Sequence, residues 1–95
     1  MLLLIQKGGD SISNKIKVRL IGADTSNGIK IIKNINKLQK QIEYPLLIDK
    51  IDSKDKEKYN IKIIPTLLID GFVVSSGNVP SDRELKNFIK KLKEA

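Results

Sequence analysis

The chain has 95 residues, of which 40% are hydrophobic and 31% are charged, and its net charge is +7. This length suits one domain with its own core, and this composition is typical of a folded globular protein and not of a disordered one. Because cysteine and histidine are both absent, disulfides, thiol chemistry, most zinc sites and imidazole acid–base catalysis are excluded for the residues of this chain.

Residues 1–14 stand apart as an N-terminal extension. Residues 1–5 are all apolar, but a membrane span needs about 20 such residues. With Lys7 and Asp10 close behind it, the run is also too short for the core of a secretory leader. We therefore expect a cytoplasmic protein with no membrane partner. An additional strand at the sheet edge and a loose segment both stay open for this extension.

The domain proper is predicted over residues 15–95 and begins with a strand over residues 15–21, where apolar residues alternate with Lys17 and Arg19. Residues 22–28 interrupt the alternation with residues that favour turns and helix caps. From residue 29 to residue 42 the apolar period changes to 3.6, which predicts an amphipathic helix. Its apolar face consists of Ile31, Ile32, Ile35, Leu38 and Ile42.

A short, almost wholly apolar strand is predicted next, over residues 46–48. Pro45 prevents the preceding helix from continuing into it. Its composition is typical of a strand that is covered on both faces. A short helix follows, capped by Asp52 or Ser53 and ending near Lys58, and Asn60 suits a left-handed residue at its end.

A hairpin and a last helix complete the pattern. The apolar runs 66–69 and 72–75 flank Asp70–Gly71, a pair that favours the type I′ turn of a β-hairpin. The last helix opens with the sequence Ser-Asp-Arg-Glu at residues 81–84, which matches the capping-box pattern. The whole order predicts an α/β fold in which a βαβ unit and a ββα unit form a four-stranded mixed sheet with helices on both faces.

Two stretches resemble a known family. Residues 63–71, Ile-Ile-Pro-Thr-Leu-Leu-Ile-Asp-Gly, resemble the segment that thioredoxins and glutaredoxins place before their third strand, with a cis proline that faces the redox centre. Residues 59–81 are also similar to small archaeal and bacterial thioredoxin-like "redox-active disulfide" proteins. The resemblance covers about Lys15 to the C-terminus and implies a thioredoxin-like fold with a cis Ile64–Pro65 bond.

The resemblance also implies where an active site would lie, at the N-terminus of the first long helix. There Thr25 takes the position of the nucleophilic cysteine, Ser26 and Asn27 are the intervening pair, and Gly28 takes the position of the resolving cysteine. The Cys-x-x-Cys motif is therefore missing, and we predict no catalytic residue. The simplest role for this segment is to cap the helix through Asp24, Thr25 or Ser26. A Thr25→Cys, Gly28→Cys variant is expected to form a disulfide.

No EF-hand calcium loop and no glycine-rich phosphate-binding motif occurs, so we expect no metal site and no cofactor. The function expected is therefore binding: a protein or peptide partner in a groove formed by Asp24, Thr25, Ile64, Pro65 and Thr66. One alternative is a member of the thioredoxin or glutaredoxin family to which a disulfide-redox role is assigned by homology. Another is a basic module for nucleic acid or another anion. Two arginines and four aromatic residues make a nucleic-acid partner the weaker alternative, and the lysine-rich helix faces are interpreted as solvated surface. We expect a monomer or a weak homo-oligomer.

Overall fold

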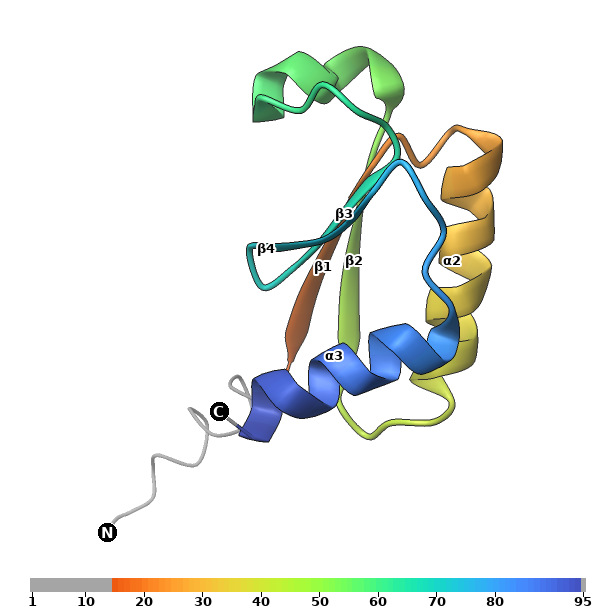
Figure 1. Cartoon of the computed structure of the whole chain (residues 1–95), viewed down its shortest axis with the longest axis vertical. Helices are drawn as coiled ribbons and strands as arrows, with labels where there is room; N and C mark the ends of the chain where they lie inside the picture. The colour runs from red at the N-terminus through yellow and green to blue at the C-terminus, as the bar shows by residue number, and fades with distance from the viewer. Residues whose placement is uncertain (1–14, 95) are drawn as a thin grey trace, which may run out of the picture.

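The structure is a computed structural model that describes residues 15–94 (Figure 1). The predicted extension, residues 1–14, lies outside them. Seven elements follow one another along the chain: β1 (Ile16–Ile21), α2 (Ser26–Gln39), β2 (Leu46–Ile51), η2 (Ser53–Tyr59), β3 (Thr66–Ile69), β4 (Phe72–Ser76) and α3 (Asp82–Glu94). Their order and type agree with the sequence prediction, except that η2 is a 3-10 helix.

The four strands form one mixed sheet in the order β2-β1-β3-β4. β1 pairs with β2 in parallel, whereas the β1–β3 and β3–β4 pairs are antiparallel. The predicted hairpin turn is present, with φ of 50° at Asp70 and 86° at Gly71. Positive φ at both central residues is the requirement of a type I′ turn, and Asp and Gly both tolerate it.

Two predicted elements differ from the structure by three residues at a boundary. The helix predicted over residues 29–42 runs from Ser26 to Gln39, because Thr25 caps it three residues earlier and the amide of Gln39 ends it. That amide donates to the Tyr44 carbonyl (3.0 Å) and accepts from the Leu46 N–H (2.8 Å). β2 runs three residues beyond the predicted strand, to Ile51, because it pairs with β1 along its whole length.

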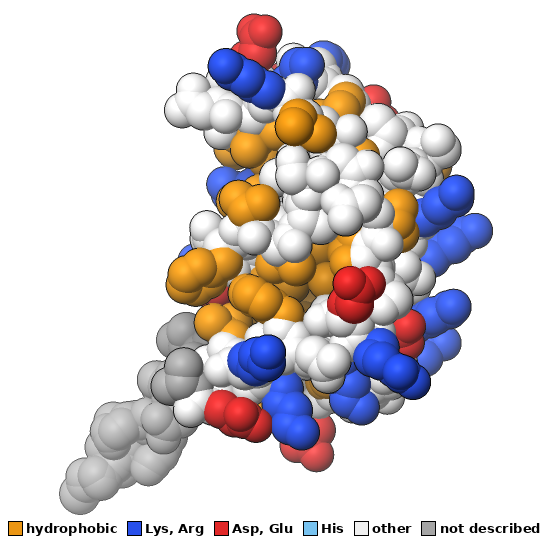
Figure 2. All heavy atoms as spheres, in the orientation of Figure 1, with side chains coloured by type: hydrophobic (Ala, Val, Ile, Leu, Met, Phe, Trp, Pro, Cys, Tyr) orange, Lys and Arg blue, Asp and Glu red, His pale blue; other side chains and the backbone are white. Residues whose placement is uncertain are grey.

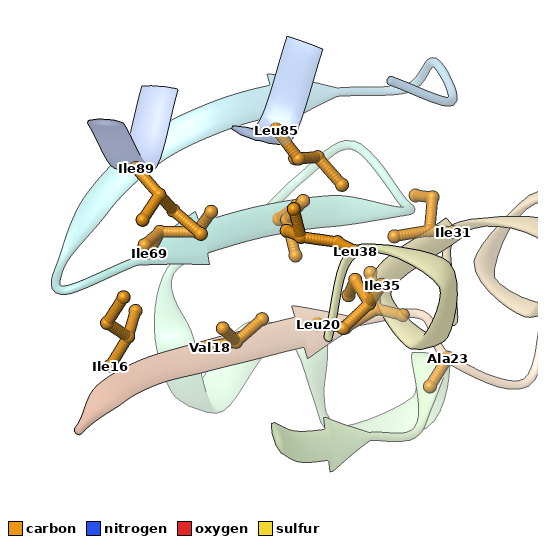
Figure 3. Close-up of a cluster of buried hydrophobic side chains, with 11 residues drawn as sticks. Ile16, Val18, Leu20, Ala23, Ile31, Ile35, Leu38, Ile69, Leu85 and Ile89 are labelled. Atoms are coloured by element: carbon orange, nitrogen blue, oxygen red, sulfur yellow. The ribbon is translucent and has the colours of Figure 1, made fainter. Parts of the chain in front are cut away.

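The hydrophobic core lies between one face of the sheet and the two long helices (Figure 3). Ile16, Val18 and Leu20 supply the β1 side chains, and α2 and α3 each turn their apolar stripe toward them.

The α3 capping box is formed as predicted: the Glu84 N–H donates to Ser81 Oγ (3.1 Å) and the Ser81 N–H donates to the Glu84 carboxylate (2.9 Å). No helix within residues 15–94 has the length and apolar character that crossing a membrane requires.

The opposite face of the sheet is only partly covered, so the prediction that β2 is covered on both faces is wrong. Leu47, the second residue of β2, exposes 46% of its surface, and Asp49 is also exposed. Among the described elements, only the short helix η2 lies on this side, at one end of the sheet (Figure 1), where the centroid of the Tyr59 ring lies 4.9 Å from the Arg19 guanidinium. The segment between β2 and β3 forms one seven-residue 3-10 helix, which is too short to cover four strands.

Candidate functional site

The predicted site loop lies between the end of β1 and the start of α2. Thr25 is the N-cap of α2: its hydroxyl accepts a hydrogen bond from the Gly28 N–H (2.9 Å) and donates one to the Gly22 carbonyl (2.7 Å). Ser26 follows in the first turn and is exposed, and Asn27 is half-buried. Because the first amides of an α-helix have no acceptor within the helix, this turn presents free N–H groups at the positive end of the helix dipole.

Asp24 ties this loop to η2. The backbone N–H and the hydroxyl of Ser53 both donate to the same Asp24 carboxylate oxygen, each at 2.8 Å. These two hydrogen bonds stabilise the carboxylate and hold the pKa of Asp24 below its ordinary value. Asp24 is thus a structural anchor of the loop, and its side chain is already engaged in the described structure.

Gly22 brings the two halves of the predicted site together. A β-carbon placed on Gly22 would lie 2.8 Å from Ile64 Cβ and 3.2 Å from Pro65 Cα, so a side chain at residue 22 would clash with this segment. Its φ of 91° also favours glycine. The Ile64–Pro65 peptide bond is cis. The Thr25 loop and the Pro65 loop are therefore neighbours.

The residues of the Pro65 loop differ in how much they expose. Ile64 is half-buried, whereas Pro65 and Thr66 are buried. The Thr66 hydroxyl donates to the Ile63 carbonyl, and the Pro65 carbonyl accepts from the Gly77 N–H (2.7 Å). Thr66 therefore holds the loop from its buried side, and Ile63 and Ile64 are the residues of the loop that solvent reaches.

Gly28 is held in place by close packing. A β-carbon at this position would overlap with the Gly22 carbonyl oxygen and lie 2.9 Å from Ala23 Cα. Both are backbone atoms, which cannot rotate away as a flexible side chain could. The expectation that Thr25→Cys and Gly28→Cys form a disulfide is thus wrong for this backbone, because the second cysteine has no room for its side chain.

Sequence reasoning missed three features: Gly22, which brings the two loops together, Ser53, which anchors Asp24 to η2, and two exposed apolar residues. Ile29, one turn into α2, exposes 50% of its surface, and Ile63 exposes 56%. The sequence contains one hint, since a glycine directly after a strand often marks a turn with positive φ. Nothing in the sequence around Ser53 indicates that it meets Asp24.

The chemistry open to this arrangement is recognition by backbone groups and apolar contact. Both hydrogen bonds of the Thr25 hydroxyl go to backbone groups of its own loop, so it acts as a cap. The chain contains no cysteine, so its own residues cannot carry out thiol–disulfide exchange. Within residues 15–94, His, Cys, Asp and Glu side chains form no group of three that could hold a metal ion.

Three hollows of the described surface lie elsewhere. One, of about 870 Å³, lies between the α2–β2 loop and the end of α3, and another, of about 760 Å³, lies on the second face of the sheet. A smaller one lies beside η2, and none of the three is lined by Thr25 or Pro65. Lys and Arg side chains follow α2 and surround α3 (Figure 2), which agrees with a solvated basic surface over these helices.

The comparisons with known proteins point in one direction. A family model described as "Thioredoxin domain" matches residues 14–90. No curated protein matches the sequence. Structural similarity is found to a malarial protein (TM-score 0.63, 19% identity, 81% of this chain and 96% of that one) and to thioredoxin-2 of the malaria parasite (TM-score 0.60, 21% identity, 81% and 82%).

A third similar structure is Deadhead, a germline-specific thioredoxin of Drosophila melanogaster (TM-score 0.57, 17% identity, 92% of this chain and 90% of that one). At these identities the structural likeness establishes the fold alone. It agrees with the mixed four-stranded sheet and the helix order described above.

Proposed function

Because the chain belongs to the thioredoxin-domain family and has no cysteine, we propose that it is a binding domain that recognises an extended segment of a protein or peptide partner. The binding surface is the shallow region between the Asp24–Gly28 loop and the Ile63–Thr66 loop. The partner supplies main-chain carbonyl and N–H groups and at least one apolar side chain. No thiol exchange takes part.

The close approach of Gly22 to Ile64 and Pro65 is the observation that carries this proposal. Gly22 leads into the loop that Thr25 caps, so we expect the free amides of the first α2 turn to lie near the backbone of Ile64. An extended segment lying along this region can accept from those amides and pair with Ile64 as a strand pairs with a sheet edge. Backbone recognition of this kind needs neither a titratable group nor a deep pocket.

Apolar contact supplies the rest of the binding energy. Each backbone hydrogen bond contributes only about 0.5–1.5 kcal/mol net, so two or three of them give modest affinity. Ile29 and Ile63 each expose about half of their surface. Covering them adds about 25 cal/mol for each Å² of apolar surface removed from water. We therefore expect an apolar side chain in the partner next to the recognised backbone.

A phage-displayed library of random linear peptides tests the proposal. Peptides selected on the full chain are titrated into the ¹⁵N-labelled protein, and amide shifts are mapped. We expect the largest shifts at Thr25–Gly28 and at Ile64. Shifts centred on Lys33, Lys37 and Lys90, with the Thr25–Gly28 amides unchanged, would contradict the proposal.

Matched variants separate apolar anchoring from loss of fold. Ile63→Asp places a charge on the proposed surface. Val73→Asp places the same charge on a residue of similar exposure, 60% against 56%, that lies on another face. We expect Ile63→Asp to weaken peptide binding at least tenfold and Val73→Asp to leave it unchanged. Equal losses in both variants would show that the effect of Ile63→Asp is not specific to this surface, and would contradict apolar anchoring at Ile63.

A further inference from the structure

We call the second face of the sheet, which η2 covers at one end only, the open face. It carries six side chains: Lys17, Arg19, Leu47, Asp49, Leu68 and Val73. Cross-strand pairing places them together, since Lys17 is paired with Leu47, Arg19 with both Asp49 and Leu68, and Leu68 with Val73. Leu47 and Val73 expose 46% and 60% of their surfaces. On the other face of the central strand β1, by contrast, the apolar side chains of Ile16, Val18 and Leu20 are buried.

The open face is also hollowed. The residues that line the hollow of about 760 Å³ described above include Leu47, Leu68 and Lys15. Lys15 is the first residue that the structure describes. The first described residue of the chain is therefore one of those that line the hollow.

The sequence before Lys15 contains an apolar run that the proposed function does not use. Residues 1–5 are Met-Leu-Leu-Leu-Ile, and nine residues, 6–14, separate them from Lys15. At about 3.3 Å per residue nine residues reach about 30 Å when extended, whereas a six-residue strand such as β1 is about 20 Å long. The apolar run is thus long enough to reach any point of the open face from Lys15.

We propose that residues 1–5 of the same chain cover the open face, with their apolar side chains against Leu47, Leu68 and Val73. The small size of the face favours this occupant over a second copy. Four strands about 4.8 Å apart and four to six residues long present only about 300 Å², less than half of the roughly 800 Å² that each partner gives to a stable interface. A segment tethered at Lys15 has an effective concentration in the millimolar range, so little buried area suffices.

A single spin label tests the proposal directly, since the absence of cysteine lets one introduced cysteine carry the label. Gln6→Cys places it next to the apolar run in the full chain. We expect the methyl signals of Leu47, Leu68 and Val73 to be broadened and those of Ile63 to be unaffected. A label at Lys33→Cys, on α2 and so beyond the other face of the sheet, is the matched control and should leave Leu47 sharp.

Two variants of the labelled chain show whether the apolar run is responsible. Leu3→Asp with Leu4→Asp should abolish the broadening, because carboxylates resist burial against leucine. Ser11→Asp with Ser13→Asp adds the same charge outside the run and should preserve it. Unbroadened Leu47 and Leu68 signals in Gln6→Cys would overturn the proposal. Broadening confined to the amides of β2 or β4 would also overturn it, because it would place the label at an edge of the sheet and not on the open face. In a mixture of spin-labelled and isotope-labelled protein, broadening between chains would indicate that a second copy covers the face.

Discussion

Gly28 is the residue at which packing reverses the usual effect of a substitution. In an ordinary helix position, replacing glycine by alanine stabilises a protein by about 0.5–1 kcal/mol, because glycine loses more chain entropy on folding. Here the added methyl group meets the backbone of Gly22 and Ala23, and neither atom can move without displacing the end of β1. At the position where the resolving cysteine of a redox pair would lie, the backbone therefore leaves no room for a side chain.

We expect Gly28→Ala to lower the free energy of unfolding by about 1–3 kcal/mol, the range for an overpacked site. Urea denaturation followed by circular dichroism measures the change. Asn36→Ala, at an exposed position of the same helix, is the matched control and should stabilise by a few tenths of a kcal/mol because alanine is the better helix former. A Gly28→Ala variant as stable as the wild type would show that the α2 N-terminus has room for a side chain.

At the scale of elements, α3 depends on its first turn. The reciprocal hydrogen bonds between Ser81 and Glu84 satisfy two amides that would otherwise lack partners. The helix then buries Leu85 and Ile89 against the sheet. Because α3 closes one end of the core, a loosened first turn should weaken the whole domain and not the helix alone.

Ser81→Ala should lower the free energy of unfolding by about 1 kcal/mol, the typical loss for an N-cap hydroxyl. Thermal and urea unfolding both report it. Ser81→Asp restores an acceptor for the Glu84 amide and should recover most of the loss, which distinguishes capping from a general effect of substitution at this site. If Ser81→Asp is no more stable than Ser81→Ala, the cap contributes little.

At the scale of the whole molecule, the net charge of +7 is spread over lysine-rich helix faces (Figure 2). Such a charge attracts nucleic acid through counterion release. However, the chain has only two arginines for bidentate phosphate contacts and four aromatic residues for base stacking. Arg19 is moreover paired with Asp49 at 3.2 Å and stacked on Tyr59.

We expect only non-specific binding to a short DNA duplex, with a dissociation constant of roughly 10⁻⁴–10⁻⁶ M at physiological salt. Fluorescence anisotropy at several salt concentrations measures it, and the same titration with single-stranded RNA covers the other nucleic acid. Nanomolar binding to either would support the basic-module alternative and place the function on the lysine faces.

The amino-acid sequence by itself determined the features that depend on neighbouring residues. Alternation in β1, the 3.6-residue period in α2 and α3, the Asp70–Gly71 turn and the Ser81 cap all follow from local conformational preference and from which side of an element is apolar. The motif around Pro65 placed the chain near the right family for a similar reason, since it is one continuous stretch.

Only the tertiary structure decided the features that join distant segments. Asp24 and Ser53 are 29 residues apart in the chain, and the approach of Gly22 to Ile64 and the contact around Gly28 depend on how the loops pack. The open face has the same origin: the apolar composition of Leu46–Ile48 predicts a buried strand, but whether both of its faces are covered depends on the length of the neighbouring segments. The pattern of apolar residues shows which side chains can be buried. Which segment covers them depends on how the chain packs in three dimensions.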